Sequence, residues 1–215
     1  MLAAALRRDI AFGVLPPDQR LKIEALRRRY GGSSHSLREA LTLLSTEGLV
    51  DATAQRGFRV ASATEEDLRD IARLRAELEP LGLRWAIARD DLAWEGRVVA
   101  AAHMLVRAET AVAQDPDGEA LAWDEASRHF HACLIEAGDS PRLNETAARL
   151  YDQSRRFRLA ALRENRLDFH RRLDQRERLL AAIMAHDGEA AARRLARIIL
   201  EEAGLDADIA PDTDD

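Results

Sequence analysis

The chain has 215 residues, of which 47% are apolar and 33% charged, and its formal net charge is −6. This length allows one large domain or two modest ones, and this balance is typical of soluble globular proteins. A single cysteine, Cys133, excludes an internal disulfide framework, and no apolar run approaches the ~20 residues that span a membrane. Aromatic residues make up only 5%, which disfavours a sheet-dominated fold. We therefore expect a mainly α, cytoplasmic protein without a membrane segment.

The charges are unevenly distributed along the chain. Through Ser62 there are ten Lys and Arg against six Asp and Glu, whereas the remainder carries 22 against 32. A basic first third attached to an acidic remainder indicates that only the first part faces a polyanion.

Three helices are expected in the first fifty residues. Apolar residues at helical spacing predict one helix over 2–12 and a short one over 23–30, separated by a glycine and a Pro-Pro turn. The third lies within 32–50, where Ser36 and Glu39 are placed to form a capping box and Gly48 ends the helix. A short helix, a glycine turn and a further helix form a helix-turn-helix, whose second helix enters the DNA major groove.

The segment VDATAQRGFRV, residues 50–60, predicts a β-hairpin directly after this motif. Apolar residues alternate on both sides of an Ala-Gln-Arg-Gly turn, and glycine permits the positive φ of a tight turn. A hairpin in this place is a wing, with Arg56 at its tip aimed at phosphates or at the minor groove. The three arginines at 27–29 are either a phosphate-binding edge or a solvated face, and the preceding motif favours the former.

These sixty residues resemble the winged-helix domain of the GntR family of bacterial transcription regulators. The resemblance rests on the apolar spacing before the turn and on LREAL, EGLV and RGFRV. It implies that the arginine of LREAL belongs to the recognition helix and that RG in RGFRV forms the wing tip. Where the family commonly has an arginine before a Thr-Pro or Thr-Thr pair, this chain has Ser-His-Ser, so its base preference is expected to be unusual. The predicted DNA contacts are Arg28, Ser34, His35, Ser36, Arg38, Arg56 and Gly57.

Beyond residue 63 the pattern is helical throughout. Breaks at Asp-Pro-Asp-Gly, Gly-Asp-Ser-Pro and Asp-Gly predict an all-α six-helix bundle. The last residues are acidic and are expected to be a disordered tail. The predicted domains are 1–62, 63–204 and the tail 205–215, and the predicted bundle helices are 67–88, 91–113, 121–137, 141–163, 167–186 and 189–203.

This second part resembles the FCD ligand-binding domain of the FadR-like branch of the same family. The resemblance rests on IARLRAELEPLGLRWAI, FHACLIEAGDSPRL and LLAAIMAHDGEAAARRL, which together span nearly the rest of the chain. Many members of this branch hold a divalent metal with an Asp and a His four residues apart on one helix, plus a His on each of the last two helices. The resemblance places Ser127, His131, Arg176 and Ile198 at these positions, so one ligand of four remains and no metal cofactor is expected. A site rebuilt from other histidines is the alternative.

In place of the metal, Arg176 is expected to supply positive charge and a bidentate fork, with Arg75 as its partner. The hypothesis is a metal-free pocket for a small carboxylate or an acyl-thioester, lined by Arg75, Ser127, His131 and Arg176. The alternative is that Arg176 is a solvated arginine.

The preferred function is a sequence-specific DNA-binding transcriptional regulator; a repressor is favoured, and an activator is the alternative. We expect a homodimer on a palindromic operator, with an effector in the bundle altering the spacing of the two winged helices. An enzyme with an accessory DNA-binding domain is the alternative, but the bundle shows no nucleophile and base pair, because Cys133 and His131 are two residues apart on one helix and point apart. Cys133 is expected to be buried, and the three tryptophans to make core or dimer contacts.

Overall fold

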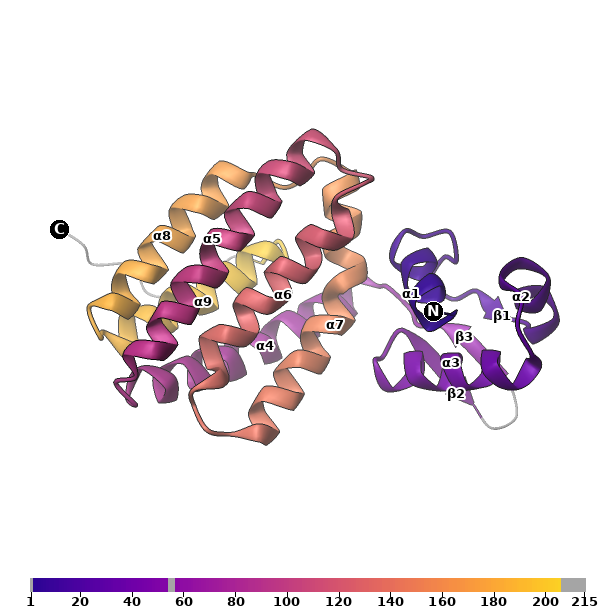
Figure 1. The fold of residues 1–215 in the computed structure, drawn as a ribbon, viewed down its shortest axis with the longest axis horizontal. Coiled ribbons are helices and arrows are strands. Elements are labelled where there is room, and N and C mark those ends of the chain that lie inside the picture. The colour runs from indigo at the N-terminus through magenta and orange to yellow at the C-terminus, as the bar shows by residue number, and fades with distance from the viewer. Residues whose placement is uncertain (1, 54–56, 206–215) are drawn as a thin grey trace.

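The computed structural model describes residues 2–53 and 57–205. The chain forms two lobes, a small N-terminal one with three helices and a sheet, and a larger one built from helices alone (Figure 1). The predicted fold class, a winged helix-turn-helix followed by an all-α six-helix bundle, is confirmed. The small lobe contains α1 (Leu2–Ala11), β1 (Arg20–Leu21), α2 (Ile23–Tyr30), α3 (Ser34–Thr46), β2 (Val50–Thr53) and β3 (Gly57–Val60).

The wing is the predicted hairpin, extended by a strand that the sequence pattern did not predict. Strand β3 lies between β1 and β2 and is antiparallel to both. Val50 pairs with Val60, whereas Leu21 of β1 pairs with Phe58. A strand of two residues is too short to show alternation, so β1 is fixed by its pairing with β3 and not by a local pattern.

Helix α3 starts with a capping box, although not the predicted one. The Ser33 hydroxyl accepts a hydrogen bond from the Ser36 backbone N–H at 3.1 Å, and Ser36 Oγ accepts one from the Ser33 N–H at 3.0 Å. The box therefore lies three residues earlier than the predicted pair of Ser36 and Glu39, because Ser33 has the extended backbone of an N-cap. Gly48, with φ +73°, follows the end of the helix as predicted.

The bundle helices agree with the predicted ones to within two residues. Several of them begin after a capping carboxylate: Asp168 accepts hydrogen bonds from two backbone N–H groups at the start of α8, and Asp187 accepts one at the start of α9. The six helices are α4 (Glu65–Ile87), α5 (Leu92–Gln114), α6 (Ala120–Glu136), α7 (Pro141–Arg163), α8 (Phe169–Met184) and α9 (Gly188–Glu202).

Each lobe has its own apolar core. In the small lobe, Leu37, Leu41 and Leu44 of α3 are fully buried. In the bundle, Trp94 and Trp123 are buried as expected, whereas Trp85 is 42% exposed. The described part of the chain contains no helix long and apolar enough to cross a membrane.

Helix α7 contacts both lobes, and in Figure 1 it lies on the side of the bundle that faces α1. Arg163 Nη2 donates a hydrogen bond to the carbonyl oxygen of Ala11 at 3.3 Å, and its guanidinium lies 4.7 Å from the ring centroid of Phe12. Ala11 itself is buried in the bundle core. The two lobes are therefore joined by side-chain contacts as well as by the linker that precedes α4.

Candidate functional site

The recognition helix presents polar side chains to solvent. Leu37 and Leu41 hold α3 against the small-lobe core, which leaves His35, Arg38 and Glu39 on the outer face. His35 has 83% of its side chain exposed, and its Nε2 lies 3.3 Å from a Glu39 carboxylate oxygen. Ser36 is half-buried, because its hydroxyl is part of the helix cap. A surface of this kind can donate to phosphates and to base edges.

The arginines of α2 differ in their contacts. Arg27 and Arg29 have carboxylates nearby, Glu24 at 3.5 Å and Asp9 at 3.1 Å. The exposed Arg28 makes a long hydrogen bond of 3.4 Å to a backbone carbonyl oxygen of its own helix. At the wing, Gly57 has φ +76°, as the predicted tight turn requires, and Arg56 lies outside the described residues.

A cavity of about 590 Å³ lies in the bundle between α4, α7 and the end of α9. Ala63, in the linker between the lobes, lines it, so the cavity reaches the connection to the DNA-binding lobe. Rim carboxylates and arginines pair with each other, Glu65 with Arg69 and Glu164 with Arg166. The apolar wall includes Leu68, Ile71, Phe157 and Ile199, and the polar groups deeper inside are Arg75, Ser154, Arg158 and Glu202.

Arg75 is held in place by a buried network. Its Nε donates to a Glu79 carboxylate oxygen at 2.6 Å, and its Nη2 lies 3.3 Å from His131 Nδ1. The same His131 nitrogen lies 2.6 Å from the second Glu79 oxygen. Burial acts to raise the pKa of Glu79, but Arg75 and then His131 outweigh it and lower this pKa to about 2. Glu79 therefore remains ionised and fixes both partners.

Asp124 holds the arginines of α7 in place, as Glu79 holds Arg75. Arg158 donates from Nε and Nη2 to one Asp124 oxygen at 3.0 and 2.7 Å, and Arg155 is bonded to the other oxygen. The Tyr151 ring has the guanidinium carbons of Arg75 and Arg158 at 4.6 and 3.8 Å from its centroid. The guanidiniums on the α4 and α7 wall of the cavity are therefore held in place by buried carboxylates and by the Tyr151 ring.

Arg176 belongs to a different network. It is 4% exposed and makes a bidentate ion pair with the buried Glu109, so it is not the solvated arginine of the alternative interpretation. Arg172 bridges the same Glu109, at 3.5 Å, to Glu202, at 2.6 Å. Glu109 already neutralises Arg176, and this buried ion pair holds α5 against α8.

The four predicted effector residues do not share one cavity. Arg75 lines the 590 Å³ cavity, and His131 lines a separate one of about 140 Å³. Ser127 and Arg176 line neither, and the Ser127 hydroxyl accepts a hydrogen bond from the Tyr151 hydroxyl at 2.6 Å. The partnership predicted between Arg75 and Arg176 is therefore replaced by two separate carboxylate pairs.

Sequence reasoning missed the residues that complete the site. Glu79 belongs to the segment LRAELEP and lies four residues after Arg75 on the same helix face. This spacing is a usable signal for an ion pair. Ser154, Arg158 and Glu202 had no comparable signal, because each lies on a helix rich in similar charged or small residues.

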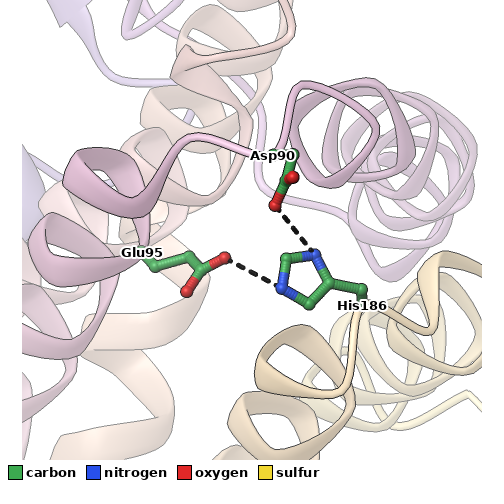
Figure 2. A group of neighbouring side chains, drawn as sticks. All are labelled: Asp90, Glu95 and His186. Atoms are coloured by element: carbon green, nitrogen blue, oxygen red, sulfur yellow. Dashed lines mark ion pairs between the residues drawn. The ribbon is translucent and has the colours of Figure 1, made fainter.

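The described residues contain one group of three side chains that offers metal-ligand atoms, and it lies away from His131. Asp90, Glu95 and His186 meet at the turns between α4 and α5 and between α8 and α9 (Figure 2). His186 Nδ1 lies 3.6 Å from Asp90, and its Nε2 lies 3.3 Å from Glu95. One metal ion binds only one ring nitrogen, and the two carboxylates lie beside opposite nitrogens of His186, so this group offers at most one imidazole and one or two carboxylate ligands.

Cys133 is buried, as predicted. Its sulfur lies 3.6 Å from Nε2 of His129, one helical turn earlier, and not beside His131. Burial is the main cause that raises the pKa of the thiol, which disfavours a thiolate nucleophile.

Comparison with known proteins agrees with both lobes. Residues 1–60 match the gntR family of bacterial regulatory proteins, and residues 70–201 match the FCD domain. The chain is 36% identical to the HTH-type transcriptional repressor GlaR of Escherichia coli K12, over 85% of this chain and 83% of that protein. It is 39% identical to BphR of Paraburkholderia xenovorans LB400, an HTH-type transcriptional regulator, over 75% of this chain and 66% of BphR.

Solved structures show the same architecture. E. coli McbR/YncC superposes with a TM-score of 0.72 at 22% identity, and a GntR regulator from Rhodococcus sp. RHA1 with 0.70 at 24% identity. Both alignments cover 94% of this chain and 93% of the other. The matching proteins and domains are transcriptional regulators and not enzymes. The chain therefore belongs to the GntR family of bacterial transcriptional regulators and carries an FCD domain.

Proposed function

We propose that this regulator is a homodimeric repressor that binds a palindromic operator in the bacterial cytoplasm and responds to a small carboxylate in its FCD domain. Its similarity to a protein named as a repressor supports the sign of regulation. Exposed apolar side chains on α5, namely Leu92, Val99 and Met104, support a protein-protein interface.

The observation that carries this proposal is the position of α7 between the cavity and the DNA-binding lobe. Ser154 and Arg158 of α7 line the cavity, whereas Arg163 contacts the end of α1. A ligand that displaces Ser154 or Arg158 therefore acts on the same helix that holds the winged helix-turn-helix. Such a helix provides a physical route for coupling between two sites.

The proposed effector contacts are Arg75, Ser154 and Arg158. Besides Glu79 and Asp124, the guanidiniums also contact His131, Ser154 and the Tyr151 carbonyl oxygen, so only the last of their five N–H donors remain for a ligand. The volume of about 590 Å³ lies in the range of small-molecule sites, and the apolar wall suits a hydrocarbon portion. These features favour a small acid with an apolar body, without a metal.

The test begins with selection of operator sequences from random DNA by the purified full-length chain. Affinity for the selected site is then measured by fluorescence anisotropy at several salt concentrations. Arg38→Ala should weaken operator binding by roughly 5- to 150-fold, because one good base contact contributes about 1–3 kcal/mol. Arg107→Ala, at an exposed arginine of α5, is the matched control and should leave affinity unchanged.

Light scattering on the same preparation measures the oligomeric state. A dimer in solution and a two-fold symmetric selected site are the expected results. Failure to select any sequence above background, or an Arg38→Ala variant with wild-type affinity at equal salt, would contradict the assignment of α3 as the recognition helix.

A further inference from the structure

Helix α7 also contacts the end of the recognition helix directly. The side chain of Gln153 in α7 fills the space that a Cβ of Gly48 would occupy, because that Cβ would lie 2.5 Å from Nε2 and 2.7 Å from Cγ of Gln153. Gly48 follows the C-cap of α3, and its backbone N–H bonds to the carbonyl oxygen of Ser45 in that helix at 3.1 Å. A displacement of Gln153 towards the DNA-binding lobe therefore meets the backbone that ends α3, without an intervening gap.

A second contact braces the same end of α3. Glu47, the C-cap residue, accepts hydrogen bonds from Nε and Nη2 of Arg7 in α1, at 2.9 and 2.5 Å. Arg7, Glu47 and Asp152 of α7 line one cleft of about 410 Å³. Helices α1 and α3 are thus joined at the point where α7 approaches them, so a push at this point moves the recognition helix as a whole.

The next residue of α7 faces the effector cavity. Ser154 lines this cavity, and its Oγ lies 3.5 Å from Nη1 of Arg75 and is bonded to Arg158. Successive residues of a helix point about 100° apart, so Gln153 and Ser154 face different sides of α7. One planar peptide group joins these two residues, so Gln153 shares any shift of the backbone at Ser154.

This arrangement places one residue of α7 between two sites. An effector that fills the cavity takes up space beside Ser154 and Arg158 and thereby displaces α7. Arg163 transmits such a shift to the end of α1, whereas Gln153 acts at the end of α3 itself. Resting on the proposed effector site, we propose that Gln153 is the positioning residue that transmits effector binding to the recognition helix through Gly48.

A covalent occupant of the cavity serves as the probe, because it requires no knowledge of the natural effector. Leu68→Cys places a thiol on the α4 wall, in a Cys133→Ala background that removes the native thiol. Methyl and butyl methanethiosulfonates then fill the cavity to different extents, and mass spectrometry confirms one label per chain. Affinity for the selected operator is measured by fluorescence anisotropy at fixed salt. The butyl label should change this affinity at least about fivefold, the lower end of typical coupling between sites.

Gln153→Ala should reduce the effect of the butyl label to less than about twofold, because the contact that carries the coupling is lost. Gln153→Met, which keeps the length of the side chain but not its amide, should restore the full effect. Gln114→Ala, at an exposed position at the end of α5, is the matched control and should also keep it. Labelled and unlabelled protein are compared within each variant, so that a change in stability or in basal affinity does not imitate a loss of coupling.

Two further thiol positions make the result decisive. Ala203→Cys lies in the same cavity, after the end of α9, and replaces Leu68→Cys if that variant does not fold. A label on Thr110→Cys, exposed on α5 and outside the cavity, should leave operator affinity unchanged. A label effect of equal size with and without Gln153 overturns the inference and leaves the proposed effector cavity intact. No effect of a label at either cavity position contradicts the proposed effector cavity, and the inference fails with it.

Discussion

The side chain of Gln153 in α7 lies directly against Gly48, the residue that ends the recognition helix region. A Cβ added to Gly48 would lie 2.5 Å from Gln153 Nε2 and 2.7 Å from its Cγ. The glycine also has φ +73°, which side chains disfavour. The DNA-binding lobe is therefore packed against α7 at a position where no larger residue fits without displacing Gln153.

Gly48→Ala should lower the free energy of unfolding by more than the backbone strain alone. Gly204 supplies the control, because it follows α9 with φ +68° and the same pair of backbone hydrogen bonds, but has open space where a Cβ would lie. Gly204→Ala should cost about 1–2 kcal/mol from left-handed backbone strain, and Gly48→Ala at least ~0.5 kcal/mol more. Urea denaturation measures both, and in a Gln153→Ala background the excess should disappear. Equal costs in all backgrounds would show that the contact between Gly48 and Gln153 has room for a Cβ.

Arg156 and Arg158 form a contrasting pair on α7. Nε and Nη1 of Arg156 are buried without a hydrogen-bond partner in the described part of the chain, and burial is the main cause that lowers its pKa. Arg158 instead bonds to Asp124 and Ser154. Arg156→Met should change the unfolding free energy by less than about 1 kcal/mol, whereas Arg158→Met should cost roughly 3–5 kcal/mol, because it leaves a buried carboxylate short of its partner.

Both variants are measured by urea denaturation at neutral pH. A loss from Arg156→Met as large as that from Arg158→Met would mean that Arg156 is bound by the carboxylates whose charges act on it, Asp67, Asp51 and Asp18. Such a result would show that Arg156 forms ion pairs that help to join the two lobes.

The sequence predicted the helices well because their boundaries depend on local chemistry. Asp168, Asp187 and Ser140 cap three of the helices, and such caps are readable in a sequence. Helix ends were less predictable where Asp139 or His186, and not a neighbouring glycine, adopts positive φ. Strand β1 was missed because it depends on pairing with a strand almost forty residues later.

The candidate site was only partly predictable, for a physical reason. Arg75 and His131, which were chosen as effector contacts, are both buried, and the structure brings them together through Glu79. The position of the cavity depends on how whole helices are spaced, which no residue pattern reports. Arg176 was chosen for its charge, but its partner Glu109 lies on another helix 67 residues earlier, beyond the reach of spacing arguments.

Acid should weaken the bundle through Glu79. Its pKa is lowered from 4.5 to about 2 on folding, so its contribution is complete above the unfolded value and is lost as the pH falls from 4.5 towards 2. Over this window the wild type should lose roughly 3 kcal/mol more unfolding free energy than Glu79→Gln, whose side chain does not titrate. Glu77→Gln, at an exposed position on the same helix, should behave as the wild type. Urea titrations at several pH values test this, and parallel pH profiles for wild type and Glu79→Gln would contradict it.

Removal of metal should leave the protein's stability unchanged. At His131 Nδ1, a metal ion would have to displace Glu79 and approach the Arg75 guanidinium, which lies 3.3 Å from that nitrogen, so cation repulsion opposes binding there. Elemental analysis of protein purified without chelator, and melting temperatures before and after chelator, measure the effect. If metal is present and stabilising, His131→Ala and His186→Ala identify its position, because the second variant removes the separate group with Asp90 and Glu95. Loss of binding in His131→Ala would restore a metal-dependent regulator, whereas loss in His186→Ala alone would place the ion at the turns of the bundle and leave the cavity metal-free.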